Sequence, residues 1–537
     1  MNKTWLRNVV VTFVIGLVLG AGSLGANEVN DLRVELTALL ARRTGGSGFQ
    51  ELPVRALTGA NTYLTAAAVA PWDSRRIVVA TTFHGLYETR DGGATWVDLG
   101  DDGRLDPIYR GSGFFEDIDA VGYDPTDRNV IWLRFAQDRS VHAVNVLRGA
   151  FVDLPTERGE RALTASFRAP IDPPELGVAT DAARAERRRL AADRNSFYLS
   201  PAQTTPERLA GHIEFAQEHG FNAVVIDFKD DFGRLRYDSQ LELARQTGAI
   251  NTVFSAQRVI DTLHAADIYV IARVVVFKDR ALARYQNGRY SVWDGRHDRP
   301  WGVFRERVDE ASGERRVEQV EYWADLFSEF VWEYNIAIAE ELQAVGVDEI
   351  QFDYIRTPSD GIMRDAVYRF HNQSPAMEGQ NPFMDDRVEA LAMFLRRARS
   401  RIDIPIGIDV FGFNAWYRMG YLGQDIAALA PYVDVISPML YPSHFARDFA
   451  AELAYLPRAE FLYEQGVARS RRITGDQVLI RPYIQAFLIG GERNFETPVY
   501  TDYLKHQIRG SLDAGASGFT LWNASGRYYM VARGLYF

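Results

Sequence analysis

The sequence predicts an α/β protein in which a (β/α)8 TIM barrel follows a small all-β domain. From residue 194 onward, short apolar runs alternate with helical patterns, which is typical of a parallel sheet covered by helices. Residues 50–165 instead contain short β-like runs bounded by turn residues. The chain contains no cysteine, so the fold depends on neither disulfides nor thiolate metal sites.

The first 26 residues have the layout of a secretory signal peptide. Lys3 and Arg7 give a basic start, residues 9–19 are mostly apolar, and a stretch rich in small residues ends at Ala26. The apolar run is shorter than the ~20 residues of a membrane span. We therefore expect a secreted or periplasmic protein that could associate with the cell envelope. An uncleaved segment that anchors the chain is the alternative.

The β-rich region contains one motif, TRDGGATW at residues 89–96. It matches the Asp-box pattern Ser/Thr-x-Asp-x-Gly-x-x-Trp at every fixed position and resembles the blades of sialidase-like propellers. Asp91 and the two glycines after it are expected to form a tight hairpin turn, with Trp96 packed beneath. An Asp-box is a structural element, so we expect no chemistry from it.

A weaker internal repeat relates residues 68–80 to residues 120–132. Two blades cannot close a propeller, so the region is expected to be either a propeller fragment or a small β-domain. Residues 166–193 follow as a linker. It consists of a Pro-rich stretch and a charged helical stretch, whose run Arg187–Arg189 is expected to face solvent.

The region 194–537 divides into eight strands with seven helices between them. The expected strands are 195–200, 222–228, 269–277, 348–354, 405–411, 433–440, 478–485 and 516–522. The expected helices are 205–219, 254–266, 328–345, 385–402, 424–430, about 459–471, and 502–514. Eight such units give a (β/α)8 barrel. A doubly wound open sheet is the alternative, but no GxGxxG or Walker pattern follows the first strand.

Carboxylates stand at the ends of three of these strands, which is where barrel enzymes place their chemistry. Asp227, Asp353 and Asp409 end the second, fourth and fifth strands. These side chains converge only if each one faces the barrel interior, and the sequence leaves open which way they face. As an alternative, each acid forms a separate salt bridge or caps a loop. Other residues near strand ends are candidate substrate ligands: Lys229, Asp230, Arg273, Tyr354, Arg356, Tyr441, His444, Gln485, Trp522 and Asn523.

Acids and aromatic residues in this arrangement favour glycoside hydrolysis. That reaction needs one carboxylic acid and one carboxylate, and it needs no cofactor. The nine histidines show no HExxH or paired-ligand spacing, so we expect no catalytic metal. The expected partner is therefore a carbohydrate substrate. The 60 Lys and Arg against 71 Asp and Glu give a net charge of −11, which disfavours nucleic acid as a partner.

Residues from about 195 to 525 resemble a barrel family of inferred glycoside hydrolases that was long catalogued as a domain of unknown function. The similar stretches, in chain order, are 222–239, 271–279, 332–358, 406–413 and 434–445. The resemblance implies a barrel and a carbohydrate-active enzyme.

Two more distant resemblances bear on the catalytic residues. VDEIQFDYI is similar to the fourth-strand chitinase signature Asp-x-x-Asp-x-Asp-x-Glu, with Asp348 and Asp353 on its first and third acids. Gln351 replaces the second acid and Ile355 replaces the glutamate, which argues against a chitinase-type mechanism. FDY also resembles α-galactosidase-type barrels, whose nucleophile is the fourth-strand aspartate. Their acid/base follows the sixth strand, where this chain has no carboxylate.

Our interpretation makes Asp353 the nucleophile or charge-stabilising carboxylate and Asp409 the acid/base. Arg356 and Lys229 would hold or tune them by charge. Asp227 and Asp230 are expected to bind substrate hydroxyls, and either is the alternative acid.

Two questions stay open at this stage. The insertion 280–321, with Asp279 and Trp301 as possible substrate contacts, is either a lid or a surface excursion.

The alternative function is that of a non-catalytic carbohydrate-binding or envelope scaffold protein, or of a barrel hydrolase or lyase of another substrate. The sequence names neither the sugar nor the oligomeric state.

Overall fold

The structure is a computed structural model. It describes residues 29–35, 38–43, 48–53, 64–81, 85–99, 118–135, 140–148, 150–168, 181–308, 315–371, 386–416, 422–446, 449–475, 477–489 and 497–531. The predicted signal peptide lies outside these residues. Within them, no helix combines the length and the apolar character that crossing a membrane requires. The chain divides into two compact units, the first mainly up to Glu175 and the second mainly from Leu176 onward.

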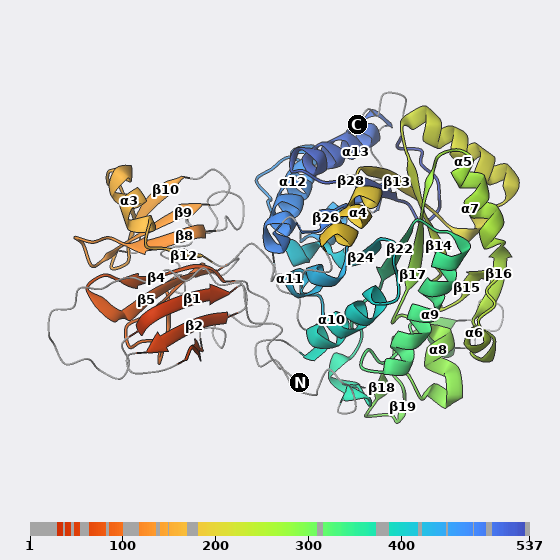
Figure 1. The fold of residues 1–537 in the computed structure, drawn as a ribbon, viewed down its shortest axis with the longest axis horizontal. Helices are drawn as coiled ribbons and strands as arrows, with labels where there is room; N and C mark the ends of the chain where they lie inside the picture. Colours follow the sequence, from red (N-terminus) through yellow and green to blue (C-terminus); the bar gives the residue numbers. More distant parts are fainter. Residues whose placement is uncertain are drawn as a thin grey trace. The chain divides into compact units, whose positions relative to one another are not determined.

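Antiparallel sheets build the first unit (Figure 1). Its strands are β1 (Val29–Glu35), β2 (Ala38–Arg43), β3 (Gln50–Leu52), β4 (Leu64–Ala70), β5 (Asp73–Thr81), β6 (Gly85–Thr89), β7 (Val97–Asp98), β8 (Ile118–Tyr123), β9 (Val130–Phe135), β10 (Val141–Asn145), β11 (Ala150–Val152) and β12 (Phe167–Arg168). They form the sheets β1–β2–β3, β12–β4–β5–β6–β7 and β11–β10–β9–β8. Strands β1 and β2 lie before the region that was predicted to be β-rich. Helix α3 (Thr156–Leu163) packs on the third sheet.

Strand β5 explains why this unit has near-continuous apolar runs. Ile77 and Val79 pack into one core cluster together with side chains of β1 and β2, whereas Val78 and Ala80 pack into another with side chains of β8 and β9. Both faces of the strand are therefore buried. The repeated segments fold as the hairpins β4–β5 and β8–β9. Their relation to a propeller stays a prediction.

The turn at TRDGGATW is held by the side chain of Asp91. Its carboxylate accepts hydrogen bonds from the backbone N–H of Thr95 at 2.8 Å and from the hydroxyls of Thr89 and Thr95 at 2.8 and 2.5 Å. Gly92 and Gly93 have φ angles of 74° and 90°, which only glycine adopts readily. Burial raises the pKa of Asp91, but the hydrogen bonds from Thr95 and Thr89 outweigh it and lower that pKa to about 2.

The second unit is a closed parallel barrel of eight staves, as predicted (Figure 1). The staves are β13 (Arg194–Leu199), β14 (Ala223–Lys229), β17 (Tyr269–Val275), β22 (Glu349–Asp353), β24 (Ile406–Phe411), β25 (Val435–Met439), β26 (Leu479–Ile480) with β27 (Tyr483–Gln485), and β28 (Gly518–Trp522). Strand β13 pairs with both β14 and β28, which closes the barrel. Pro482 lacks an N–H group and lies where the seventh stave is split.

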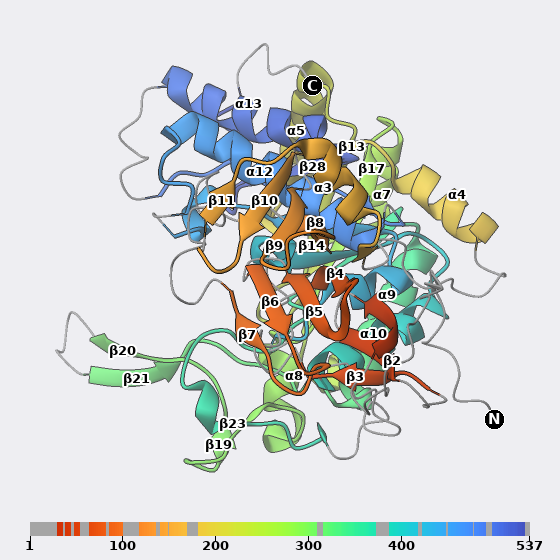
Figure 2. The same ribbon diagram turned by 90° about the vertical axis from the view of Figure 1, so that its left-hand side faces the viewer.

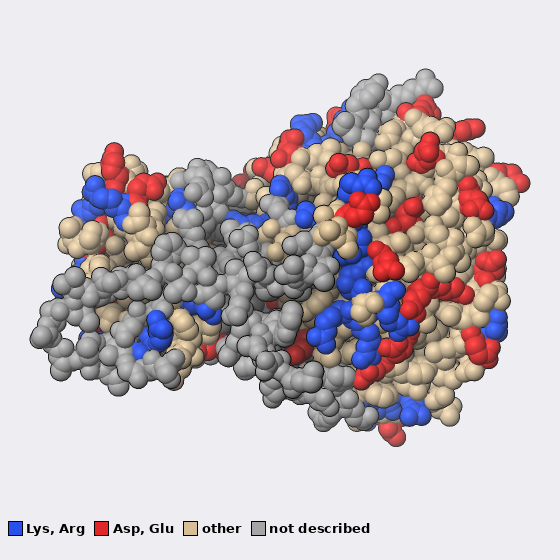
Figure 3. All heavy atoms as spheres, viewed as in Figure 1, with Lys and Arg blue, Asp and Glu red and all other residues tan. Residues whose placement is uncertain are grey.

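Helices follow the strands around the barrel. They are α5 (Pro206–His219), α7 (Ala256–His264), α9 (Glu329–Val345), α10 (Asp386–Arg399), α11 (Ile426–Leu429), α12 (Tyr455–Thr474) and α13 (Thr497–Asp513), which agrees with the predicted positions. Glu329, Glu333 and Glu340 of α9 pair with Arg397 and Arg401 of α10 and the turn after it. Figure 3 shows basic and acidic side chains interspersed over this face.

Helix α4 (Asp181–Ala191) belongs to the barrel unit and lies across the ring of strands in Figure 1. Arg184 donates to the carbonyl of Ala430 at 2.8 Å, and Arg187 pairs with the buried Asp434, just before β25, at 3.1 Å. The expectation that Arg187 faces solvent is therefore wrong, because its guanidinium neutralises a buried acid. The helix packs at the N-terminal ends of the strands, opposite the C-terminal ends at which barrel enzymes place their chemistry.

Two insertions extend the strand–helix units. After β14 come β15 (Leu235–Tyr237), α6 (Glu242–Gln246) and β16 (Ile250–Phe254). After β17 come α8 (Arg280–Arg284), β18 (Trp293–Asp294), β19 (Arg299–Pro300) and the hairpin β20 (Phe304–Val308) and β21 (Arg315–Gln319), which projects from the barrel in Figure 2. Strand β18 pairs with β23 (Ala366–Val367), which ties this insertion to the loop after β22.

Candidate active site

The pairing of the strands shows which of their side chains face the barrel interior. Asp227 pairs with Arg273, Arg273 with Gln351, and Gln351 with Gly407 across β14, β17, β22 and β24. Because side chains alternate along a strand, Asp353 and Asp409, each two residues further, share the face of this row. All three predicted acids therefore face the barrel interior.

Arg273 joins these acids. Its Nη1 donates to Oδ1 of Asp227 at 2.6 Å, and its Nε and Nη2 both donate to Oδ2 of Asp353 at 2.8 and 2.5 Å. Its Nε also lies 4.0 Å from Oδ2 of Asp409. The acids share one buried guanidinium instead of forming separate ion pairs.

Asp353 is held as a hydrogen-bond acceptor on both oxygens. Besides the two bonds from Arg273 to Oδ2, its Oδ1 accepts the backbone N–H of Tyr354 at 2.5 Å. Tyr354 has a φ of 49°, a left-handed conformation that is unusual for a bulky residue and that is often found at functional sites. The sharp bend directs the Tyr354 amide at the carboxylate.

Asp409 has the opposite environment. Its side chain is 1% exposed, and neither oxygen has a hydrogen-bond partner among the described residues. Burial raises the pKa of Asp409 well above its usual value, and the charge of Asp353 raises it further against the Arg273 cation. The surroundings of Asp409 thus favour its neutral form, whereas those of Asp353 stabilise a carboxylate.

Asp227 is fully engaged by protein groups. Its Oδ1 accepts from Arg273, and its Oδ2 accepts the hydroxyl of Tyr198 of β13 at 2.7 Å. The predicted role of Asp227 was to bind a substrate hydroxyl, but here its carboxylate fixes the position of Arg273. Tyr198 was not among the candidate residues; its inward register in the first strand is the signal that could have indicated it.

The rim of the site carries alternating charges. Asp231, with a 40% exposed side chain, lies 3.6 Å from Nη2 of Arg273. Nζ of Lys278 lies 3.9 Å from Asp231, 3.4 Å from Glu321, and 4.8 Å from the ring centre of Tyr354. Asp231 and Lys278 follow the ends of the second and third strands in the sequence but were not chosen as candidates, and neither was Glu321. Glu321 shows that the end of the 280–321 insertion reaches the rim.

Two aromatic groups flank the acids. The guanidinium of Arg273 lies 5.3 Å from the ring centre of Trp522, and that ring lies 4.2 Å from the ring of Tyr198. On the other side, Arg356 packs within 4.7–5.1 Å of the rings of Trp323, Tyr354 and Phe411. The predicted residues Trp522, Tyr354 and Arg356 therefore belong to the walls of the site.

Tyr441 is the other predicted residue that lies with the acids. It is 4% exposed, and its hydroxyl has no hydrogen-bond partner among the described residues. Burial raises the pKa of Tyr441 well above its usual value, and the charges of Tyr463, Asp409 and Asp353 add to the shift. His444 is exposed and packs edge-on against the Tyr441 ring.

Lys229 and Asp230 lie apart from this cluster. Lys229 is fully buried between the barrel wall and α9, where its Nζ donates to the Asn335 side chain at 2.8 Å and lies 2.8 Å from Oδ2 of Asp279. The carboxylate of Asp230 accepts backbone N–H groups of Phe232 and Arg234 and closes the turn after β14.

Gln485 and Asn523 are engaged by the backbone. Gln485 accepts from the N–H of Ser443 at 3.1 Å, and Asn523 donates to the carbonyls of Ala486 and Arg527. Asp279 is buried with Lys229, and the Trp301 indole donates to the carbonyl of Ile362.

The residues of the chitinase-like stretch have separate structural positions. Asp348 accepts the N–H of Val270 at 2.7 Å at the start of β22. Gln351 is buried inside the barrel, bonded to Tyr483 at 2.7 Å and Ser437 at 3.2 Å. Ile355, at the position of the chitinase glutamate, is fully buried.

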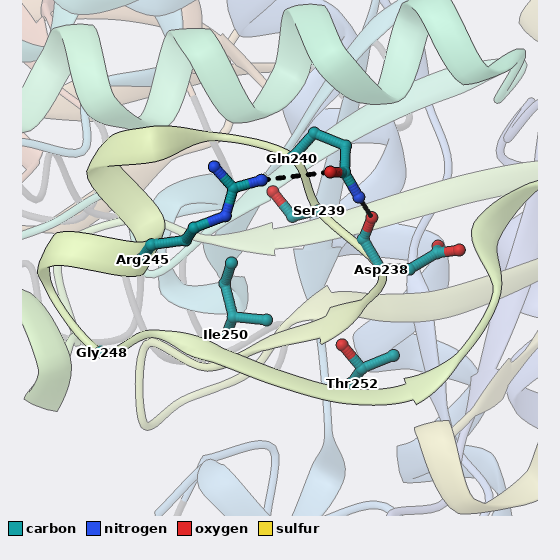
Figure 4. Close-up of a pocket in the computed structure, with 7 residues that line it drawn as sticks. All are labelled: Asp238, Ser239, Gln240, Arg245, Gly248, Ile250 and Thr252. Atoms are coloured by element: carbon teal, nitrogen blue, oxygen red, sulfur yellow. Dashed lines mark hydrogen bonds between the residues drawn. The ribbon is translucent and has the colours of Figure 1, made fainter.

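A cavity of ≈ 490 Å³ lies in the first insertion (Figure 4). It is lined by Asp238, Ser239, Gln240, Arg245, Gly248, Ile250 and Thr252. Figure 4 shows Arg245 reaching the side chain of Gln240, a contact of 3.1 Å. No inward residue of the barrel lines it, and it contains no pair of carboxylates, so we place the chemistry at the Arg273 cluster. Among the described residues, no group of three or more His, Cys, Asp or Glu could hold a metal ion.

Barrel enzymes place their active sites at the C-terminal ends of the strands, and the closed (β/α)8 barrel of this chain gathers three carboxyl groups around Arg273 there. A family model described as "Putative glycosyl hydrolase domain" matches residues 196–528, and the chain belongs to this family. A comparison with curated proteins gives no match.

Several solved structures are similar to the chain. A hypothetical protein from Ruminiclostridium thermocellum ATCC 27405 is 28% identical over 40% of this chain and 97% of its own, with a TM-score of 0.32. The PgaB (BpsB) glycoside hydrolase domain from Bordetella bronchiseptica is 14% identical over 63% of this chain and 95% of its own, with a TM-score of 0.38. The Bacillus cereus spore cortex-lytic enzyme SleL is 11% identical over 63% and 72%, with a TM-score of 0.34.

Proposed function

We propose that the protein is an exported glycoside hydrolase that cleaves O-glycosidic bonds of an oligo- or polysaccharide, with Asp353 and Asp409 as its catalytic pair. The unequal environment of these two neighbouring carboxyl groups supports this most. Asp353 accepts three hydrogen bonds, two of them from a cation, whereas Asp409 is buried with a raised pKa. One carboxyl group held by a cation and a neighbouring one whose burial favours the neutral form match the requirements of glycoside hydrolysis.

In the proposed reaction, neutral Asp409 donates its proton to the glycosidic oxygen while the bond from that oxygen to the anomeric carbon breaks. The carboxylate of Asp353 takes up the positive charge on that carbon, by a covalent bond or as an ion pair. Water then adds to the carbon and returns a proton to Asp409. Arg273 holds the carboxylate of Asp353 in position through Oδ2.

Substrate binding is assigned to the walls and the rim. The half-buried Trp522, whose ring also contacts Tyr198, Tyr483 and Arg273, is proposed to present the exposed part of its ring to a sugar. Asp231 and Lys278 offer charged groups to sugar hydroxyls at the rim. Export is proposed from the sequence of residues 1–26.

The test is hydrolysis of a panel of aryl glycosides and oligosaccharides by the wild type, Asp353→Asn and Asp409→Asn. We expect turnover of at least one substrate that both changes abolish. Asp261→Asn, an identical change on the exposed face of α7, is the matched control and should leave turnover intact. Sugar binding that survives both active-site changes, without turnover in the wild type, would instead indicate a carbohydrate-binding scaffold.

A further inference from the structure

Arg481 lies inside the barrel at the level of Asp409. Strand β24 pairs Asp409 with Ser437 of β25, and β25 pairs Ile436 with Ile480 of β26. The next residues along the chain, Ser437 and Arg481, are thus neighbours as well. Asp409, Ser437 and Arg481 occupy one level on three consecutive strands, which are spaced ~4.8 Å apart.

Asp409 and Arg481 also have complementary unpaired groups. Arg481 is fully buried and donates through Nη2 to Oε1 of Glu349, but its Nε and Nη1 have no hydrogen-bond partner in the part of the chain that the structure describes. Both oxygens of Asp409 lack a partner in the same sense. Two donor nitrogens of Arg481 and two oxygens of Asp409 are therefore unpaired inside the same barrel. Buried polar groups in folded proteins are almost always satisfied by protein or by ordered water.

The residues between them are small. Ser437 stands between Asp409 and Arg481, and Gly407 stands one inward position below Asp409. A Cβ atom at Gly407 would lie 2.9 Å from Oε1 of Glu349, so glycine is needed to accommodate the Glu349–Arg481 pair. A buried water needs polar partners and room; the unpaired atoms of Arg481 and Asp409 supply the partners, and the small residues Ser437 and Gly407 limit the side-chain volume beside them.

We propose that Arg481 is a positioning residue for Asp409, and that its Nε and Nη1 hold ordered water which hydrogen-bonds the Asp409 carboxyl. The water would accept from the guanidinium and donate to a carboxyl oxygen. Such a bridge favours the ionised form of Asp409 and opposes the effect of burial. Arg481 would thereby keep the acid within reach of deprotonation, which an acid/base needs in the second half of the reaction. This catalytic meaning rests on the proposed function, whereas the bridge itself does not.

Other charged groups face Asp409 from the surrounding strands. Asp353 and Glu349 of β22 oppose its ionisation, whereas Arg273 of β17 and Arg481 favour it. Tyr441 and Tyr483 also lie within reach of the charge of Asp409. Glu349 and Arg481 therefore shift the ionisation of Asp409 in opposite directions. The direction of the shift on replacing each residue tests the proposal.

The experiment is an infrared pH titration of the protonated carboxyl band of Asp409, assigned by its loss in Asp409→Asn. It compares Glu349→Gln, which keeps the Arg481 cation, with the double variant Glu349→Gln/Arg481→Gln, which keeps a buried amide pair and removes the cation. We expect the midpoint of the double variant to lie about one pH unit above that of Glu349→Gln. The midpoint of Glu349→Gln should lie below that of the wild type.

A high-resolution crystal structure of the wild type provides the second measurement. We expect water density within hydrogen-bond distance of Arg481 Nε or Nη1 and of an Asp409 oxygen. Equal midpoints in the two variants, or protein groups bonded to both nitrogens, would overturn the proposal. Neither measurement uses turnover, so a wild type that hydrolyses no glycoside would count against the proposed function and leave this inference standing.

Discussion

Arg273 donates two hydrogen bonds, from Nε and Nη2, to a single oxygen of Asp353, Oδ2, at 2.8 and 2.5 Å. Its remaining nitrogen, Nη1, is held by Asp227, which is itself fixed by Tyr198. The chain Tyr198–Asp227–Arg273–Asp353 crosses four strands of the barrel. It gives the proposed nucleophile a fixed position that does not depend on substrate.

This relationship predicts that a positive charge alone at position 273 does not support full catalytic activity. Arg273→Lys keeps a cation but loses the planar fork that reaches two acids at once. We expect kcat to fall by about 100-fold, because a small displacement of a catalytic group has an effect of that size. Steady-state kinetics on a hydrolysed glycoside measures it, and Arg401→Lys, in the surface pairs with Glu333 and Glu340, is the matched control. An unchanged kcat in Arg273→Lys would contradict the assigned role.

The raised pKa of Asp409 predicts a stability effect of defined sign. Its folded pKa lies well above the unfolded value near 3.9, so its contribution to stability is fully present below pH 3.9 and is lost as the pH rises through the folded pKa. Asp409→Asn carries no ionisable group. We therefore expect the melting temperature of Asp409→Asn to gain on that of the wild type as the pH rises. Thermal unfolding of both proteins between pH 4 and 9 measures this difference, and a constant difference would exclude a buried neutral acid.

The sequence predicted the barrel well because each strand is a local apolar run with a helical pattern after it. It also named the three acids, since a charge near the end of an apolar strand is conspicuous. The sequence placed Lys229 beside the acids, but its side chain lies elsewhere. The reason is a local irregularity in the strand. Strict alternation would turn Asp227 and Lys229 to the same side, but the pairing of β14 with β17 shifts register between them. The shift directs Lys229 outward, to Asp279 and Asn335.

Lys229→Met is accordingly predicted to affect folding more than substrate binding. The change leaves Asp279 as a buried charge without its cation, and breaking a buried pair in this way costs about 3–5 kcal/mol. Denaturant unfolding of the full chain measures the loss. The double variant Lys229→Met/Asp279→Leu removes both charges and should recover part of the stability. A normal stability with a raised KM would show that Lys229 contacts substrate after all.

The Asp91 turn predicts a pH-dependent loss of stability in the first unit. Asp91→Ala removes the acceptor for Thr89 and Thr95, and we expect a loss of about 1–2 kcal/mol at neutral pH. The folded pKa of about 2 lies below the unfolded value near 3.9, so the contribution is present above pH 3.9 and is lost as the pH falls toward 2. Unfolding at pH 7 and pH 3 measures this. Asp73→Ala, which breaks only the exposed contact with Arg75, should change stability little.

Trp522 is predicted to supply binding energy without taking part in the chemistry. Its ring lies against the Arg273 guanidinium, which binds Asp353, and packs on Tyr198. Trp522→Ala should raise KM by about tenfold, since stacking of aromatic surfaces contributes about 0.5–1.5 kcal/mol beyond simple burial. Trp522→Phe keeps a ring face and should recover most of the affinity, with circular dichroism confirming that both variants fold. A fall in kcat at unchanged KM would instead mean that Trp522 positions Arg273, and the sugar-stacking role would have to be abandoned.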